Sequence, residues 1–213
     1  INRGFDVTVI ERNNLPAMET SFANAGLIAT GHAFAWNSPD LFYDLLKPNS
    51  KVHSAFKIHW SLSPDLLKWG LQFLRNCSKS KFIEFSNAKR NLCQYSHQIL
   101  KQIILKENIA CNYNPSGIYY LHRTNLGIQK AIKKINMFDG LIDQYQILNE
   151  TDLTTPFFRK SKFIGGLIFS KDGAGDCHLY TTQLENICKQ NGVRFQYNSE
   201  VTSINQKNGV FHS

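Results

Sequence analysis

An acidic residue at the end of a short apolar strand is the first position in the chain that could bind a ligand. Residues 6–11 read Asp-Val-Thr-Val-Ile-Glu, a pattern typical of a buried parallel strand that ends in a carboxylate. In a dinucleotide-binding βαβ unit, the acid at the tip of the second strand accepts hydrogen bonds from the ribose hydroxyls. We therefore expect Glu11 to bind the ribose of a nucleotide cofactor, with an ordinary strand-end acid as the alternative.

A stretch of small residues shortly after Glu11 offers a second set of ligand-binding groups. Residues 19–28 read Glu-Thr-Ser-Phe-Ala-Asn-Ala-Gly-Leu-Ile. Ser21 can offer a hydroxyl to a phosphate, and Ala25, Gly26 and Leu27 can present backbone N–H groups that no bulky side chain covers. Such donors suit a pyrophosphate or the polar edge of a flavin ring, whereas a turn without function is the alternative from the pattern alone.

Hydrophobic periodicity predicts the elements that must position these residues. Apolar side chains at three- and four-residue spacing predict helices over residues 64–76, 82–107, 129–138 and 181–192, the last ending at Gly192 as a C-cap. Short apolar runs predict strands over residues 117–121, 145–148, 166–169, 193–197 and 200–204.

The order of these elements is the layout of a split cofactor domain of the α/β class. A nucleotide-binding half is followed by an α+β insertion and then by a return to strand, helix and strand. We expect residues 1–45 and 170–213 to form the cofactor-binding domain, and residues 46–169 to form an inserted, partial substrate domain.

Composition excludes several other classes of protein. The net charge of +8 is spread over lysines and arginines that form no basic stripe with a recognised motif, so we expect no nucleic-acid partner. The five cysteines form no C-x-x-C pair and no Cys and His cluster has ligand spacing, so we expect no metal and a reducing compartment. Without an apolar stretch that could span a bilayer and without a secretory signal, a cytoplasmic location is expected.

Residues 47–82 combine cations with aromatic side chains, which suits the surface of an anionic bilayer. The residues concerned are Lys47, Lys51, Lys57, Lys68, Arg75, Lys79 and Lys81 with Phe56, Ile58, Trp60, Trp69 and Phe73. We expect a peripheral contact with the inner face of the cell membrane. A helix with its aromatics in the core and its lysines in solvent is the alternative.

Several stretches, taken together, resemble one large family of flavoproteins. The chain resembles the D-amino acid dehydrogenase branch of the FAD-dependent amine and amino-acid oxidoreductases, which also include D-amino acid oxidase-like and glycine oxidase-like enzymes. The stretches that carry the resemblance are Asp6 to Arg12, Glu19 to Ser21, Ala23 to Gly26 with Ile28, Trp36 with Pro39, Leu74 to Cys77, Gly165 to Leu167, Asp172, Gly175 to Cys177 with Tyr180, Gly192-Val193 and Glu200-Val201.

The resemblance implies a fold and a reaction. It implies a split FAD-binding domain, Rossmann-like and of the glutathione-reductase type, with an inserted α+β substrate domain. The expected reaction is oxidative deamination of a D-amino acid to a 2-oxo acid and ammonia. The flavin supplies the redox chemistry, and the electrons are expected to pass to a quinone or another respiratory electron-transfer acceptor.

The resemblance also implies roles for individual residues. Glu11 would bind the ribose, and Arg12 would lie beside the adenosine half of FAD. Val201 would hold the adenine by backbone groups. The residues expected to line the phosphates and the flavin are Ser21, Asn24, Ala25, Gly26 and Leu27.

A catalytic residue is harder to name. His32 stands where the resembled enzymes carry a tyrosine and is the candidate for handling a proton at the substrate, because its ordinary pKa lies near neutrality. Of Tyr119 and Tyr120, one should face inward, since side chains alternate along a strand. Asp176 and Cys177 are expected to serve packing and turn formation. No arginine in the chain is a clear candidate for the substrate carboxylate.

Two departures from the family pattern bear on activity. The glycine-rich turn expected about 20 residues before the strand-end acid is not in the sequence, and we expect the chain to be incomplete at both ends. Residues 1–213 alone are therefore expected to be inactive and to bind FAD weakly or not at all. Two alternatives stay open: a flavoenzyme of the glycine or sarcosine oxidase type, and a non-catalytic gene remnant.

Overall fold

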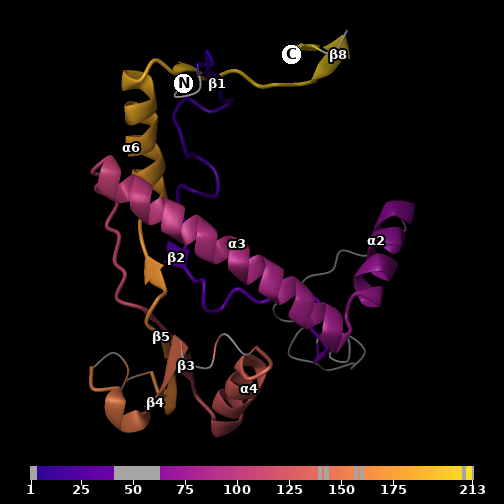
Figure 1. The fold of residues 1–213 in the computed structure, drawn as a ribbon, viewed down its shortest axis with the longest axis vertical. Coiled ribbons are helices and arrows are strands. Elements are labelled where there is room, and N and C mark those ends of the chain that lie inside the picture. Colours follow the sequence, from indigo (N-terminus) through magenta and orange to yellow (C-terminus); the bar gives the residue numbers. More distant parts are fainter. Residues whose placement is uncertain are drawn as a thin grey trace. The chain divides into compact units, whose positions relative to one another are not determined.

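Figure 1 shows the protein as a computed structural model, which describes residues 4–40, 63–138, 141, 144–155, 158, 161–207 and 210–212. The chain forms two compact units, each assembled from separated segments. The first unit comprises residues 1–28, 99–115 and 173–213, and the second comprises residues 29–98 and 116–172. The long helix α3 (Lys79–Lys106) contributes its first part to the second unit and its last turns to the first.

The first unit contains a pair of parallel strands close to the start of the chain. Strand β1 (Thr8–Ile10) pairs with β7 (Arg194–Gln196), with Val9 opposite Phe195. Helix α6 (Cys177–Gln190) precedes β7, so the strand that follows this helix rejoins the strand at the start of the chain. This pairing is the return of the chain into the first sheet that the predicted order of elements requires.

A short antiparallel pair completes the framework of the first unit. Strand β2 (Leu27–Ile28) pairs with β6 (Gly173–Ala174), and Ala174 also forms a bridge to Asn114. Beyond the pair, the Gly175 N–H donates to the Gly26 carbonyl at 2.9 Å. These bonds hold the residues around Gly26 against those around Gly175.

The second unit is built on a three-stranded antiparallel sheet with helices packed beside it. Its strand order is β3 (Ile118–His122), β5 (Gly165–Phe169) and β4 (Tyr145–Asn149), with Leu167 opposite both Tyr120 and Ile147. The unit also contains α2 (Pro64–Arg75), α4 (Asn125–Ile135) and the 3-10 helix η3 (Glu150–Asp152).

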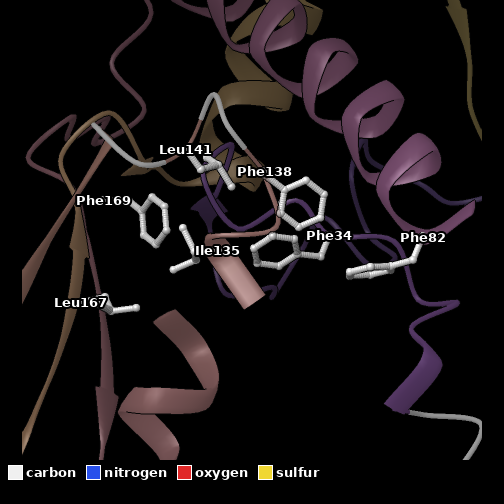
Figure 2. Close-up of a cluster of buried hydrophobic side chains, with 7 residues drawn as sticks. All are labelled: Phe34, Phe82, Ile135, Phe138, Leu141, Leu167 and Phe169. Atoms are coloured by element: carbon white, nitrogen blue, oxygen red, sulfur yellow. The ribbon is translucent and has the colours of Figure 1, made fainter. Parts of the chain in front are cut away.

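The core of the second unit is an aromatic and aliphatic cluster, drawn in Figure 2. Its buried members are Phe34, Phe82, Ile135, Phe138, Leu141, Leu167 and Phe169. Phe34 comes from the segment that follows β2, while Phe82 comes from α3 and Phe169 from β5. Burial of Phe34 therefore anchors the segment that carries His32 to the helices and the sheet of this unit.

Most predicted elements are present, with shifts at helix starts. The predicted helix at 64–76 and the strand at 145–148 are confirmed to within a residue. Helix α4 begins four residues before the predicted start because Thr124 caps it, its hydroxyl accepting from the Gly127 N–H at 3.1 Å. Asp176 likewise caps α6, which begins four residues before its predicted start, and accepts from the Leu179 N–H at 2.8 Å.

The predicted strand at 200–204 is wrong. After β7 the chain turns at Asn198, whose φ is +53°, and the N–H groups of Asn198 and Ser199 donate to the carbonyls of Asn13 and Glu11. This turn directs the chain away from the ladder, and residues 201–204 belong to no strand. The next strand is β8 (Asn205–Lys207), which forms a hairpin with β9 (Val210–His212).

Three features expected from composition can be compared with the described residues. All five cysteines are free thiols. In the described part of the chain, no group of three or more His, Cys, Asp or Glu side chains is arranged to hold a metal ion. No described helix combines the length and the apolar character that crossing a bilayer requires.

Candidate functional site

Glu11 lies at the carboxyl end of a parallel strand, the position predicted for it. It directly follows β1, and its N–H donates to the Gln196 carbonyl at 2.9 Å. The half-buried carboxylate accepts at Oε1 from the Asn13 N–H at 2.8 Å and from Asn13 Nδ2 at 3.0 Å. Asn13 thus fixes the direction of the Glu11 carboxylate at the strand tip.

Arg12 and Glu19 close the loop that leads from β1 to the small-residue stretch. Arg12 Nη2 lies 2.6 Å from Glu19 Oε1, and Asn13 Nδ2 donates to the same oxygen at 3.3 Å. These contacts raise the pKa of Arg12 and lower the pKa of Glu19, in each case first through their mutual hydrogen bond. Both side chains are exposed, so Arg12 keeps further N–H donors available to another partner. Ser21 follows two residues after Glu19 in the same loop.

Gly26 stands where only a glycine fits. Its φ is +61°, and a Cβ on Gly26 would overlap the Gly175 carbonyl. Asn24 accepts from the Gly26 N–H through its side-chain oxygen at 2.8 Å, which closes a tight Asx turn. The turn and the bond from Gly175 bring residues 24–26 and 175–177 together.

Two hollows lie on this junction of residues 24–26 and 175–177 in the first unit. One has a volume of about 320 Å³ and is lined by Ser21, Phe22, Asn24, Ala25, Gly26, Asn112, Ala174, Gly175, Asp176 and Cys177. The other, of about 430 Å³, shares Asn24, Ala25, Gly26, Gly175, Asp176 and Cys177 and adds Leu27, Ile28, Leu100, Ile104, Cys111, Tyr113 and Tyr180. The first hollow is the more polar, whereas aliphatic side chains from α3 make the second more apolar.

The amino end of α6 lies at both hollows, which the sequence did not predict. Asp176 and Cys177, predicted to serve packing and turn formation, cap and begin this 14-residue helix and line both hollows. The first N–H groups of a helix have no partner within the helix and favour anions. The sequence does contain a signal for this helix start, because Asp176 is a typical N-cap residue. The helix was predicted to start later because its apolar periodicity begins further along.

Of the predicted phosphate and flavin residues, Ser21, Asn24, Ala25 and Gly26 line the first hollow, and Leu27 lines the second. Val201 is different. It lies outside any strand with 45% of its surface exposed, so the strand expected to present its backbone is absent. A contact between Val201 and an adenine stays a prediction.

His32 belongs to the second unit and packs among aromatic rings. Its imidazole stacks on the Tyr120 ring with centroids 4.4 Å apart, and its edge meets the rings of Phe34 and Phe169. Desolvation by these rings, and then the positive charge of Lys134, lower the pKa of His32 to about 4. With this pKa the imidazole is neutral near pH 7, and its exposed side remains open to solvent. The near-neutral pKa on which the prediction for His32 relied is therefore not what the structure gives.

The alternation of Tyr119 and Tyr120 is resolved. Tyr120 turns toward His32, and its hydroxyl donates to Asp172 Oδ2 at 3.4 Å. Tyr119 is 50% exposed and packs against Phe158, with ring centroids 5.8 Å apart. Tyr120 is therefore the inward-facing member of the pair.

Comparison with known proteins relates this geometry to a family. Residues 1–213 match the family described as "FAD dependent oxidoreductase". A D-amino acid dehydrogenase from Vibrio atlanticus is 31% identical over 212 residues, which cover 96% of this chain and 50% of the relative. The chain therefore spans about half the length of this curated relative.

Solved structures show the same fold. A glycine oxidase from Bacillus cereus superposes with a TM-score of 0.54 at 16% identity, over 97% of this chain and 44% of that one. An FAD-bound L-alpha-glycerophosphate oxidase from Mycoplasma pneumoniae gives a TM-score of 0.51 at 17% identity, over 96% and 42%. The predicted fold class and the FAD cofactor are confirmed. The chain belongs to the family of FAD-dependent oxidoreductases.

Proposed function

We propose that the whole protein oxidatively deaminates D-amino acids to 2-oxo acids and ammonia and passes the electrons to a respiratory acceptor. The observation that carries the proposal is the 31% identity to a D-amino acid dehydrogenase over 96% of this chain. The identity extends over both compact units, so it includes the segments proposed to contact the cofactor and the substrate.

The groups at the first hollow fit the phosphates of FAD. Ser21 brings a hydroxyl, and α6 brings the N–H groups of its first turn. Gly26 lets the Gly175 carbonyl approach where a side chain would block it, which holds the turn of residues 24–26 against the start of α6. Residues Ser21, Asn24, Ala25 and Gly26 are proposed to hold the phosphates, with Leu27 toward the flavin.

Glu11 is proposed to bind the ribose. Asn13 orients the carboxylate through Oε1, and no described residue donates to Oε2. That oxygen is then available to a ribose hydroxyl. Arg12 would contact the adenosine half with the donors that Glu19 leaves unused.

The proposed division of labour gives the first unit to the cofactor and the second to the substrate. When bound, FAD supplies an acceptor for the hydride that leaves the amino acid. His32 is proposed to meet the substrate amine: with its lowered pKa the imidazole is neutral near pH 7, and a ring nitrogen can accept a hydrogen bond from the amine. The expectation that residues 1–213 alone bind FAD weakly stays a prediction.

A direct test is an assay of the whole protein with D-alanine, L-alanine and a dye acceptor. The proposal expects dye reduction and ammonia release with D-alanine only. A yellow protein that retains FAD but reduces no dye with any D-amino acid would refute it. Peroxide formed from glycine or sarcosine in air would instead favour the oxidase, to which the glycine oxidase fold similarity points.

A peripheral membrane contact is proposed for α2, within the cytoplasm at the inner face of the cell membrane. This helix has no buried residue, and Leu67, Trp69 and Leu71 are 57%, 60% and 60% exposed. Lys68 and Arg75 lie on the same helix and would favour anionic headgroups. The part of the predicted basic and aromatic segment at 47–62 lies outside the described residues.

Sedimentation with lipid vesicles tests the membrane proposal. The whole protein should bind vesicles with anionic lipid at low salt and release them at high salt, and the double variant L67S/L71S should bind less. Leu126→Ser, which removes an exposed leucine of α4 in the same unit, serves as the control. Equal binding to neutral and anionic vesicles, or none to either, would contradict a charge-assisted contact.

A further inference from the structure

Asp172 is a buried carboxylate for which the proposed function gives no role. Its residue is 0% exposed, and no described cation forms an ion pair with it. Burying a carboxylate is costly unless hydrogen bonds or an opposite charge compensate for lost hydration. Neutral donors from three residues of the second unit provide that compensation.

Two of these donors come from the segment that carries His32. The Thr30 hydroxyl donates to Asp172 Oδ1 at 3.0 Å, and the Gly31 N–H donates to the same oxygen at 2.8 Å. The third donor is the Tyr120 hydroxyl, 3.4 Å from Oδ2. One side chain therefore holds both the residues just before His32 and the ring on which its imidazole stacks.

The backbone of Asp172 is itself fixed to the sheet. Its N–H donates to the Phe169 carbonyl at 3.2 Å, and its carbonyl accepts from the Gly117 N–H at 3.0 Å. Gly31 packs so closely on Phe169 that a Cβ on Gly31 would overlap the ring. The segment at residues 30–32 is thus held between the carboxylate of Asp172 and the ring of Phe169.

We infer that Asp172 is a positioning residue for His32: its carboxylate fixes Thr30, Gly31 and the Tyr120 hydroxyl, and so sets the imidazole on the Tyr120 ring. The inference rests on the proposed function only in assigning His32 to the substrate amine. The position of the imidazole can be measured whether or not that assignment holds.

Such a device matters here because His32 is exposed, whereas Thr30 and Gly31 just before it are buried and can be held in place. A side chain that bonds the substrate amine must lie within hydrogen-bond reach of it, and small displacements lower the rate steeply. Stacking alone leaves the ring free to slide. The bonds from Asp172 to the preceding backbone and to the Tyr120 hydroxyl restrict both partners of the stack.

The first measurement is the NMR signal of the His32 ring in the whole protein labelled at histidine, assigned with H32Q. In the wild type this signal should lie upfield, because the ring lies on the face of Tyr120. D172A should move it toward the position of a free imidazole, whereas D172N, whose amide oxygen can still accept from Thr30 and Gly31, should leave it near the wild-type position.

The second measurement is a double-mutant cycle on kcat for D-alanine. H32Q should lower kcat by about a hundredfold and D172A by about tenfold or more, while D172A/H32Q should be no slower than H32Q because both act through one group. D152N, which removes an exposed carboxylate of the same unit, should leave kcat unchanged. If D172A fails to fold, T30V removes a single hydroxyl contact and should shift the His32 signal in the same direction.

The outcomes separate the inference from the proposed function. An unshifted His32 signal in folded D172A, or losses that multiply in the double variant, would overturn the positioning role. If the whole protein oxidises no D-amino acid, the proposed function fails, while a shifted His32 signal in D172A still supports the positioning role.

Discussion

At the scale of the residue, two glycines and two carboxylates define what the chain can do. Gly26 and Gly31 each permit an approach that a side chain would block, one against the Gly175 carbonyl and the other against Phe169. Glu11 and Asp172 are each oriented by neutral donors. The two glycines allow segments of the chain to pack closely. The two carboxylates lie at the places proposed to meet the cofactor and the substrate.

Substitution of Gly26 should be costly for stability. Gly26→Ala adds a Cβ at a φ of +61° and against a carbonyl, so we expect a loss of about 1–3 kcal/mol. Gly70, in α2, is the matched control, because a Cβ added there would meet nothing within 4 Å. Gly70→Ala should be neutral or stabilising by up to about 1 kcal/mol. Urea denaturation of both variants measures the difference, and equal effects would contradict the close approach at Gly26.

His32 should make stability depend on pH in a defined window. Its folded pKa, about 4, lies below its ordinary value, so between these values the unfolded state binds the extra proton and stability falls as pH falls. Glu19 and Glu185, whose pKa values are lowered, contribute only below the ordinary range of a carboxyl group. Denaturation at about pH 6.5 and about pH 5 should show a smaller drop for H32Q than for the wild type. The same drop in both would contradict a desolvated imidazole.

At this scale the sequence predicted the turn around Ser21 and Gly26, but not the residues at 175–177 that pack against it. The spacing of small residues located Ser21 and Gly26, because close backbone approach requires such residues in any fold. Asn112, Gly175 and Cys177 were missed as lining residues because they reach the hollow only through tertiary pairing. The same applies to Asp172, whose role depends on donors 141 and 142 positions away in the chain.

At the scale of the element, side-chain caps set the helix starts that apolar periodicity did not locate. Apolar spacing placed the long helices and the strands of the second unit, since those patterns reflect a buried face. It placed the starts of α4 and α6 four residues late, because Thr124 and Asp176 cap polar first turns. The strand expected at 200–204 failed for a different reason, because the chain turns away from the sheet at Asn198.

The N-cap of α6 allows a prediction about the stability of this helix. Asp176→Ala removes the acceptor of the Leu179 N–H and should cost about 1 kcal/mol of stability. Asp176→Asn keeps an acceptor of the same shape and should cost less. Chemical denaturation compares the two, and an equal loss in both would show that the carboxylate charge, rather than the cap, holds the amino end of the helix.

At the scale of the whole molecule, the parallel pairing of β1 with β7 is the decisive feature. It joins two segments separated by most of the chain, so the groups around Glu11 and those before β7 belong to one unit. Sequence order predicted this return because a helix followed by a strand typically rejoins a parallel sheet. The chain spans 50% of its curated relative, so cofactor binding is to be measured on the whole protein.

The affinity of the whole protein for FAD tests the central claim most directly, because Glu11 is proposed to bind the ribose. Titration of the apoprotein with FAD should show E11Q binding about ten to a hundredfold more weakly than wild type, as loss of a hydrogen bond to a charged group predicts. E84Q, which removes an exposed carboxylate of the second unit, should bind as wild type does. An E11Q affinity equal to that of the wild type would contradict the account.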